Sequence, residues 1–557
     1  TLNPKPTLCA LRPRSEIRNR GRVVRYGAKK QKGLFRFSLY INTCSMPGVA
    51  VARATPRARL SPRRALCAAG RCRSRARPGA SYAMSSADDT DWQSLKRQEK
   101  GVVNLAVGHP HPAALPNAIL ARAFERAAAG LVAPSDESVG GAGARVPMSY
   151  VARRGEPATI RTLATFLSDA YSETASWSAR PARHAVRGSE LLLVAGASHG
   201  LDVACAALTK PGDVVVVETP SYFLAADVFA DRGLRVVGVA GAGLKKTSAP
   251  EADETATDAS FDVGALEDRL RDGLRPRLVY VVPTHGNPRS GTMSSEKRKR
   301  LLRLAGEYDF YVVADEVYHL LSWGEGELAP PPRFREVERE MRGEEGREEA
   351  TGTTSDESDD PYAEPAEDGN ANAADDDDSR VASLGSFSKI LAPGVRLGWI
   401  EAGPRLIRAL ADRGYLSSGG CVSPLAASVA TFVIASGDQK TWLRSLRRRY
   451  ASAAAVLADA VSRETASTGW RMRSVPSGGY FAWIELPETC DVDAFALEAK
   501  KEAVATLSGG RCVAGEADPD AAAACGRCVR VCFAYLDEDD IEEGVRRLAC
   551  AVRRSVK

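Results

Sequence analysis

A lysine late in the chain lies between two short apolar segments, Val381–Leu384 and Val395–Ile400. Three nearby residues can bind an anion, and they are Ser386, Ser388 and, seven positions after the lysine, Arg396. The flanking segments have the composition of buried strands, so Lys389 is expected on a turn at the edge of a sheet. Loss of water at such an edge lowers the pKa of an amine and makes it nucleophilic. A solvated surface lysine is the alternative interpretation of so short a motif.

Two apolar segments upstream also end in polar side chains. Leu278–Pro283 leads to Asn287, and Phe310–Ala314 leads to Asp315, with Tyr318 three positions further on. Open α/β sheets bind ligands at the carboxyl ends of their strands. An aspartate beside a pyridine nitrogen keeps that nitrogen protonated, which an electron-sink cofactor requires. Together with an imine-forming lysine, these residues indicate a site for pyridoxal phosphate.

The order of a strand-end Asn, Asp-x-x-Tyr and Ser-x-Ser-Lys resembles the aspartate-aminotransferase-like group of pyridoxal-phosphate enzymes, fold type I. The resemblance extends over about residues 103–552. It implies an α/β protein with a three-layer α/β/α, mainly parallel sheet and a smaller α+β C-terminal domain. It also implies that Lys389 forms the imine with the cofactor, that Asp315 holds the ring nitrogen, and that Asn287 and Tyr318 hold the ring oxygen.

Other matched segments complete the implied cofactor site. Residues 191–201 correspond to the turn that holds the phosphate at a helix N-terminus, where free N–H groups and the helix dipole favour an anion. Residues 218–223 correspond to the segment that stacks an aromatic ring on the pyridine, which makes Tyr222 a catalytic residue beside Lys389 and Asp315. The remaining implied cofactor ligands are Ala197, Ser198, Ser386, Ser388 and Arg396.

Substrate contacts follow from the same resemblance. Arg530 matches the arginine that binds the substrate carboxylate through a two-point fork, and Asn287 is expected beside it. Gly108 matches the segment that folds over the substrate, although it could serve only a turn. Tyr150 resembles a tyrosine that reaches the phosphate of the neighbouring subunit, which implies a homodimer with shared active sites. The alternative for Tyr150 is a packed aromatic residue at the start of a helix.

The implied reaction is amino-group transfer from an L-amino acid to a 2-oxo acid. The seven-residue spacing from Lys389 to Arg396 is closer to 2-aminoadipate, kynurenine and related broad-specificity aminotransferases than to other class I members. A lyase or decarboxylase that uses the same imine is one alternative. A regulator that binds the cofactor without turnover is another, but such proteins usually carry an amino-terminal helix-turn-helix, and the leader lacks the apolar periodicity of one.

Composition divides the chain into segments. An acidic tract at 325–378, rich in Gly, Asn, Ser and Thr, cannot bury a core and is expected to lack structure. The expected parts are a leader at 1–87, an arm at 88–145 that joins the small domain, a large cofactor domain at 146–403 and a small C-terminal domain at 404–557.

The leader, residues 1–87, contains about 20 Lys and Arg but a single acidic residue, Glu16. This composition is typical of a transit peptide and predicts a soluble protein of a plastid (chloroplast) or mitochondrion. Without these residues the formal net charge of +6 becomes about −13, so the basic balance gives no reason to expect a nucleic-acid partner. A basic nucleic-acid arm is the competing interpretation of the leader. No apolar run reaches the length of a membrane span.

Cysteines and histidines predict no metal site. Cys525 and Cys528 have the spacing of a zinc knuckle, but a second pair is missing and the six histidines do not cluster near them. His199 and His285 adjoin the matched motifs without occupying positions where the family fixes a histidine. We therefore expect local hydrogen bonds from both residues.

Overall fold

The structure is a computed structural model that describes residues 101–131, 146–174, 185–241, 243–244, 260–324, 329–343, 378–420 and 422–557. All of these residues belong to one compact unit, Arg77–Lys557. The predicted leader, 1–87, lies outside the described residues. Within the described ranges, no helix is long and apolar enough to cross a membrane.

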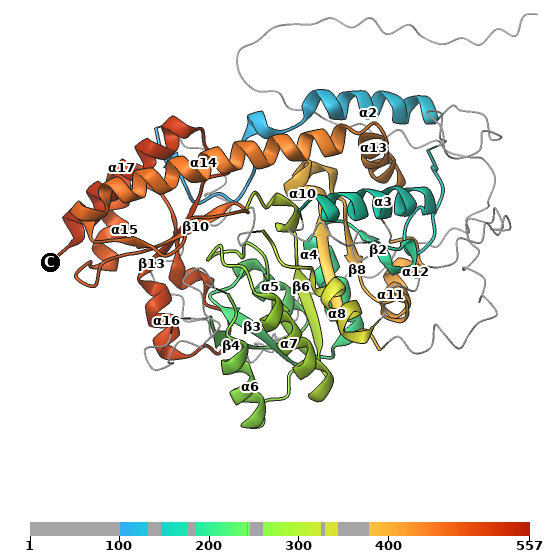
Figure 1. The fold of residues 1–557 in the computed structure, drawn as a ribbon, viewed down its shortest axis with the longest axis horizontal. Helices are drawn as coiled ribbons and strands as arrows, with labels where there is room; N and C mark the ends of the chain where they lie inside the picture. The colour runs from blue at the N-terminus through green and yellow to red at the C-terminus, as the bar shows by residue number, and fades with distance from the viewer. Residues whose placement is uncertain are drawn as a thin grey trace, which may run out of the picture. The chain divides into compact units, whose positions relative to one another are not determined.

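A seven-stranded sheet forms the centre of the cofactor domain (Figure 1), and its strand order is β2-β8-β7-β6-β5-β3-β4. Strands β3 to β7 pair in parallel, whereas β8 is antiparallel to both β2 and β7. The strands are β2 (Leu191–Val194), β3 (Val214–Thr219), β4 (Arg235–Ala240), β5 (Leu278–Val281), β6 (Tyr311–Asp315), β7 (Val381–Ser386) and β8 (Gly398–Glu401). This sheet is the mainly parallel one that the sequence predicted.

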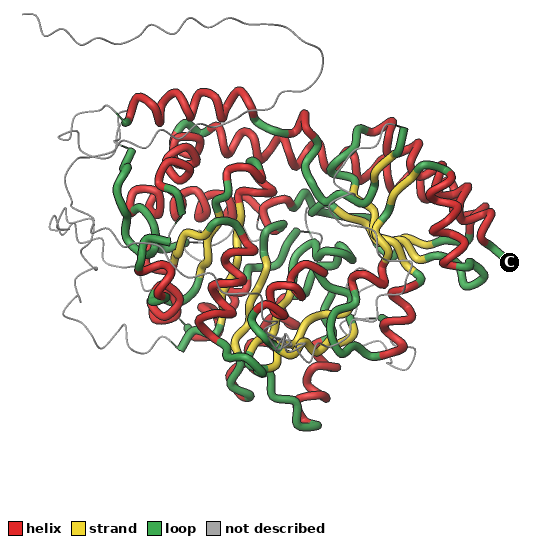
Figure 2. The backbone as a smooth tube through the Cα atoms, turned by 180° about the vertical axis from the view of Figure 1, so that it is seen from behind, coloured by secondary structure: helices red, strands yellow, loops and turns green. Residues whose placement is uncertain are grey.

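Helices cover both faces of this sheet, as Figure 2 shows. Successive residues of β3 point to opposite faces, so Val215 and Val217 pack with α4 and α5, and Val216 packs with α6, α7 and α8. Strands buried on both sides read as continuous apolar runs, which explains the valine-rich sequence of β3. These helices are α4 (Ala197–Leu208), α5 (Phe223–Asp231), α6 (Val263–Arg271), α7 (Ser295–Glu307) and α8 (Phe334–Arg342).

The prediction of an unstructured insert at 325–378 is wrong for residues 329–343. These residues contain α8, which connects the parallel neighbours β6 and β7. Parallel strands require a crossover, and a helix usually provides it. Phe334 and Val337 of α8 are buried against the sheet. The rest of the tract, residues 344–377, lies outside the described residues.

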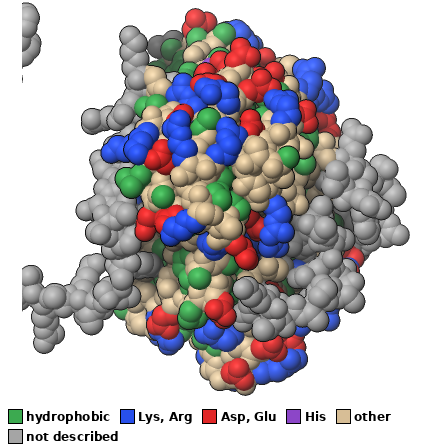
Figure 3. Space-filling view, turned by 90° about the vertical axis from the view of Figure 1, so that its left-hand side faces the viewer, with side chains coloured by type: hydrophobic (Ala, Val, Ile, Leu, Met, Phe, Trp, Pro, Cys, Tyr) green, Lys and Arg blue, Asp and Glu red, His purple; other side chains and the backbone are tan. Residues whose placement is uncertain are grey.

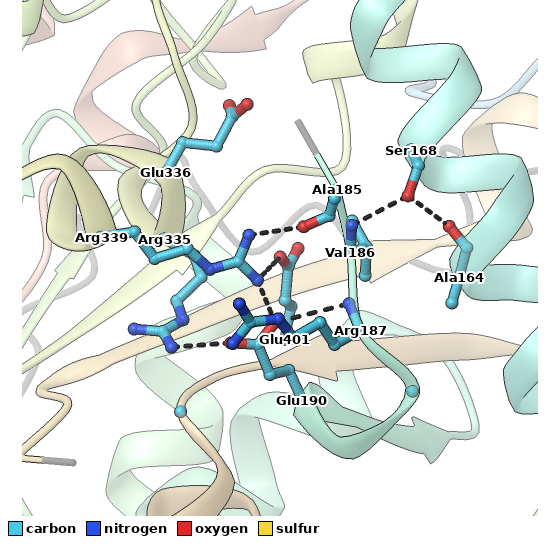
Figure 4. Close-up of polar contacts among 12 residues, drawn as sticks. Ala164, Ser168, Ala185, Val186, Arg187, Glu190, Arg335, Glu336, Arg339 and Glu401 are labelled. Carbon is cyan, nitrogen blue, oxygen red and sulfur yellow. Dashed lines mark hydrogen bonds and ion pairs between the residues drawn. The ribbon is translucent and has the colours of Figure 1, made fainter. Parts of the chain in front are cut away.

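Buried charged side chains of α8 lie beside opposite charges, and Figure 4 shows Arg335 and Arg339 reaching Glu190. Glu190 accepts hydrogen bonds from Arg335 at 2.7 Å and from Arg339. Glu338 accepts from the Ser379 hydroxyl and from the Arg380 amide, both at 2.7 Å. Burial opposes the charge of Glu190, but the two arginines outweigh it and lower its pKa. Composition alone therefore misrepresents α8 as an exposed acidic segment.

Two smaller sheets belong to the C-terminal part of the chain. One has the order β12-β13-β10-β9, and in the other β1 pairs in parallel with β11, so the expected arm contributes a strand here. The strands are β1 (Val103–Asn104), β9 (Arg471–Met472), β10 (Phe481–Glu485), β11 (Val504–Ala505), β12 (Leu507–Ser508) and β13 (Cys528–Cys532). The helices that accompany them are α14 (Asp438–Thr468), α15 (Val492–Lys501), α16 (Pro519–Gly526) and α17 (Glu538–Ser555).

The segment after Gly403 packs differently from the expected small domain. Helix α11 lies against α4 and β2, and α13 lies against α2 and α3. The long helix α14 is the first to pack along the C-terminal helix α17. The boundary expected at residue 404 is therefore too early by three helices, α11 to α13. The elements are α2 (Asn117–Gly130), α3 (Pro157–Thr174), α11 (Pro404–Ala411), α12 (Gly414–Ser417) and α13 (Pro424–Ala435).

Charges of both signs are intermixed on the face that Figure 3 shows. Several surface side chains of α14 and α17 form ion pairs, among them Arg553 with Glu464 and Arg463 with Glu542, both at 2.7 Å. Such exposed pairs contribute little to stability individually.

Candidate active site

The predicted lysine follows the central strand β7 directly. Lys389 lies in α10 (Phe387–Ile390), a single turn whose start is capped by the Ser386 hydroxyl, which accepts a hydrogen bond from the Ser388 amide at 3.1 Å. The parallel strands β3, β5, β6 and β7 all end at the same edge of the sheet. Segments separated by more than a hundred residues therefore supply one site, as expected for an open α/β sheet.

The Lys389 amine is buried in a mainly aromatic environment. Its Nζ donates to the Gly108 carbonyl at 3.0 Å and lies 5.0 Å and 5.9 Å from the ring centroids of Tyr480 and Tyr318. The pKa of Lys389 is lowered to about 8, mainly by burial; Arg530 acts in the same direction, whereas Cys532 and Asp315 oppose the shift. About a tenth of the amine is then neutral at pH 7, far more than for an ordinary lysine, and the neutral form is the one that acts as a nucleophile or base.

Asp315 lies at the end of β6 with one carboxylate oxygen satisfied. Its Oδ2 accepts from the Tyr280 hydroxyl at 2.8 Å, whereas Oδ1 is buried and has no hydrogen-bond partner among the described residues. Burial raises the pKa of Asp315 to about 6, although Tyr280, the Val317 amide and Lys389 lower it. A protonated ring nitrogen would supply the missing donor and a compensating charge. The residues present therefore fit a pyridine cofactor.

The two residues expected at the substrate carboxylate are in contact. Arg530 lies in β13, is buried, and donates from Nη1 to Asn287 Oδ1 at 2.9 Å and from Nη2 to the Ala106 carbonyl at 2.7 Å. Its guanidinium carbon lies 4.1 Å from the centroid of the Phe481 ring. These contacts fix the plane of the guanidinium group, so it is preorganised to bind a planar carboxylate.

The residues expected at the phosphate also meet. Arg396 donates from Nη1 to the Ser388 hydroxyl at 3.3 Å and from Nη2 to the Ala195 carbonyl at 2.8 Å. Ala197 and Ser198 follow as the first residues of α4, where helix N–H groups are free to bind an anion. Lys389, Ser388 and Arg396 thus belong to one segment of the chain, and its arginine contacts the turn that leads into α4.

The three predicted tyrosines lie in different surroundings. Tyr318 is buried, and its ring lies beside the Lys389 amine. Tyr222 precedes α5, and burial raises its pKa to about 12, with Asp315 raising and Arg530 lowering it. Tyr150, in contrast, is 71% exposed, and its ring lies beside Gly419. Within this chain it is not brought to Lys389.

Two residues of the site were missed by sequence reasoning. Tyr280 lies inside the apolar run of β5, so it was interpreted as core, although its spacing of two from Val282 places it on the α4–α5 face with Asp315. Tyr480 lies just before β10 in a segment interpreted as an ordinary sheet strand. Both residues are tyrosines, and the hydroxyl of a buried tyrosine usually finds a hydrogen-bond partner. This was the sequence signal that could have identified them.

Metal ligands do not assemble within the described ranges, where no group of three or more His, Cys, Asp or Glu side chains could hold an ion. Cys525 and Cys528 are buried free thiols, and burial raises the pKa of Cys528 to about 12. Such thiols are unreactive.

Comparison with known proteins decides the family. The model of aminotransferase class I and II matches residues 148–548. The chain belongs to the class I and II aminotransferases. This aminotransferase therefore uses pyridoxal phosphate and transfers an amino group between an amino acid and a 2-oxo acid, as the sequence motifs predicted.

Curated relatives and a solved structure agree with this assignment. The aminotransferase is 28% identical to aromatic-amino-acid aminotransferase 1 of Thermococcus litoralis, over 66% of this chain and 73% of that protein. It is also 28% identical to 2-aminoadipate transaminase of Thermus thermophilus, over 66% of this chain and 76% of that protein. The crystal structure of the α-aminoadipate aminotransferase LysN from Thermus thermophilus, complexed with N-(5′-phosphopyridoxyl)-L-leucine, is 26% identical, with a TM-score of 0.57 over 82% of this chain and 92% of that one.

Proposed function

We propose that Lys389 is the catalytic lysine of this aminotransferase and that Asp315 holds the cofactor's ring nitrogen. The observation that carries the proposal is the pairing of a buried amine of lowered pKa with a buried carboxylate whose Oδ1 needs a donor. Ser388, Arg396 and the start of α4 would bind the phosphate. Tyr222 would stack on the ring.

Each residue has a defined task in the reaction. Bound pyridoxal phosphate supplies an electron sink for the substrate's α-carbon. Arg530 orients the substrate by its carboxylate, and Asp315 keeps the ring nitrogen charged. The Lys389 amine takes the proton from the substrate's α-carbon and delivers it to the cofactor carbon that carries the transferred nitrogen. The rings of Tyr318 and Tyr480 beside the Lys389 amine would limit the access of water to this proton transfer.

The aromatic surroundings favour donors with aromatic side chains. Tyr318 and Tyr480 flank the Lys389 amine, and Phe481 lies against Arg530. Rings of this kind bind another ring through offset or edge contacts. We therefore propose aromatic L-amino acids as donors, as the name of the Thermococcus litoralis relative indicates for that protein.

A donor screen tests this function. L-Phenylalanine, L-tyrosine, L-2-aminoadipate and L-aspartate are each incubated with 2-oxoglutarate, and L-glutamate and carbon dioxide are measured. Glutamate formation with the highest kcat/KM for an aromatic donor is expected. Carbon dioxide without glutamate would support a decarboxylase, and cofactor binding without any product would support a regulator. A preference for aspartate would refute the proposed aromatic donors but not the aminotransferase reaction.

We also propose that the active enzyme is a homodimer. The support is the exposure of three large apolar or aromatic side chains, Met148, Tyr150 and Tyr415. Of these, Tyr415 meets the His199 ring at the start of α4. A second copy would cover them and could bring its tyrosine to the phosphate. Light scattering should give twice the monomer mass, and Tyr150→Phe should weaken cofactor binding. A monomer with full activity would refute this proposal.

Localisation in a plastid or mitochondrion is proposed from the composition of residues 1–87 alone. A fluorescent protein fused after residue 87 should enter one of these organelles, and the same fusion lacking residues 1–87 should not. Accumulation of the full fusion in the nucleus would favour the basic-arm interpretation.

A further inference from the structure

Both main-chain polar groups of Ala195 are held by side chains at the predicted phosphate turn. The carbonyl accepts from Arg396 Nη2 at 2.8 Å, and the N–H donates to His199 Nδ1 at 2.9 Å. His199 is the third residue of α4, so its ring reaches back over the first turn, as a side chain does in a capping box. The two groups belong to adjacent peptide units joined at the Ala195 Cα, so a change in the backbone dihedrals of Ala195 would disturb these hydrogen bonds and shift the arginine.

The surroundings of His199 select the neutral ring with its proton on Nε2. Because Nδ1 accepts from a backbone N–H, it carries no proton of its own. Burial lowers the pKa of His199, and Asp202 opposes this shift, but Asp202 is itself paired with Arg232. The Tyr415 ring meets the imidazole edge-on, with 5.9 Å between the ring centroids. The imidazole is thus fixed in place as a hydrogen-bond acceptor.

The turn itself has little freedom to adjust. Gly196, between Ala195 and α4, has a φ of +93°, and a Cβ built there would lie 2.8 Å from Arg396 Nη2. Arg396 therefore packs directly on the backbone of the turn. A change in the backbone dihedrals of Ala195 would therefore displace both the guanidinium group and the N–H groups at the start of α4.

From these contacts we propose that His199 is a positioning residue for the cofactor phosphate. By accepting the Ala195 N–H it restrains the backbone at Ala195, and the carbonyl of this residue, in the next peptide unit, holds Arg396. The imidazole itself need not touch the phosphate. This inference rests on the proposed phosphate role of Arg396 and of α4. Loss of the His199 hydrogen bond should therefore weaken the binding of the cofactor's phosphate and not the binding of its ring.

The test compares a ligand that carries the phosphate with one that lacks it. Pyridoxal phosphate and pyridoxal are titrated into apoprotein prepared from the full-length holoenzyme, and the dissociation constants are obtained from absorbance. His199→Leu should weaken pyridoxal phosphate about tenfold, the order expected for one lost hydrogen bond in a charged site, and leave pyridoxal within about twofold. His199→Asn should restore most of the affinity, since its Oδ1 takes the place of Nδ1.

Other outcomes separate the alternatives. Equal weakening of both ligands by His199→Leu, or no recovery with His199→Asn, would overturn the positioning role. If His199→Leu does not fold, His199→Gln replaces it in the test. The glutamine amide oxygen lies one bond further from the backbone than His199 Nδ1, so it does not match the position of the lost acceptor. Full affinity for pyridoxal phosphate in His199→Gln would therefore also overturn the role. Wild-type apoprotein that binds pyridoxal as tightly as pyridoxal phosphate would refute the proposed phosphate site itself, together with this inference.

Discussion

The hydroxyl of Tyr480 donates a hydrogen bond to the main-chain carbonyl of Lys389 at 3.2 Å, and the ring of the same tyrosine lies 5.0 Å from the Lys389 amine. Tyr480 directly precedes β10 of the small sheet, whereas Lys389 follows β7 of the large one. Tyr480, which leads into the small sheet, thus contacts Lys389 at its main-chain carbonyl and near its side-chain amine. The position of the amine depends on how the two sheets meet.

Replacing Tyr480 should therefore slow turnover more than it weakens substrate binding. Tyr480→Leu is expected to lower kcat about tenfold, because a ring face attracts a cation with about 1–2 kcal/mol in a desolvated site. Tyr480→Phe keeps the ring and should retain most of kcat. Steady-state kinetics and α-proton exchange measure the effect, with Tyr450→Phe as control, since that change removes only the outer hydroxyl contact to Tyr480. Unchanged exchange in Tyr480→Leu would contradict the account.

Cofactor binding should depend on the ionisation of Asp315. Burial raises the pKa of this carboxyl to about 6 in the ligand-free protein, and a positively charged ring nitrogen favours its ionised form. Binding below pH 6 must therefore release a proton from Asp315, and affinity should fall as the pH decreases through 6. Pyridoxal, which has no phosphate to titrate, is the suitable ligand for this measurement between pH 5 and 8. The dependence should be absent in Asp315→Asn, and an identical slope in both proteins would disprove it.

Arg530→Lys should raise KM for the amino donor and for the oxo acceptor together, by about tenfold or more. A lysine has no planar fork and cannot keep the contacts to both Asn287 and the Ala106 carbonyl. Arg511→Lys, in the same part of the small domain, is the matched control and should change neither constant. If both Michaelis constants stay at the wild-type value in Arg530→Lys, another residue anchors the substrate.

Residues 344–377 should be dispensable for chemistry. Glu338 of α8 already binds Ser379 and Arg380, so the described ends of this segment are held together without it. Longer loops add little closure cost, and a short Gly/Ser linker should leave turnover within a few-fold. Loss of cofactor binding would show that the segment contributes to the site.

The contrasting change removes the charge that α8 packs against, at Glu190 just before β2. Glu190→Gln is expected to destabilise the protein by about 3 kcal/mol, because it leaves Arg335 and Arg339 buried beside a neutral side chain. Thermal unfolding of this variant and of the linker variant distinguishes the folded part of the acidic tract from the remainder.

The sequence was most informative where chemistry and strand ends coincide. Asn287, Asp315 and Lys389 each follow an apolar run, and the structure brings their strands to one edge of a single sheet. The α/β fold and the reaction follow from that order, and both are confirmed by the family and its solved structures. The role of each site residue remains a prediction.

Other features depended on partners that lie far away in sequence. The charges of α8 look exposed until Glu190, more than 140 residues earlier, is placed beside them. Tyr480 gains its role only when the small sheet packs onto the turn of Lys389. The role proposed for Tyr150 requires a second subunit, which one chain cannot provide. Local pattern therefore identified the strand ends but not the contacts between distant segments.

Borohydride reduction of the holoenzyme, followed by peptide mapping, is the most direct test of the central claim. The buried amine of lowered pKa beside Asp315 predicts that the cofactor becomes attached irreversibly to Lys389. Lys389→Ala should fold, show no such attachment and lose transamination by several orders of magnitude. Attachment to another lysine of the wild-type protein, or transamination retained in Lys389→Ala, would contradict the account.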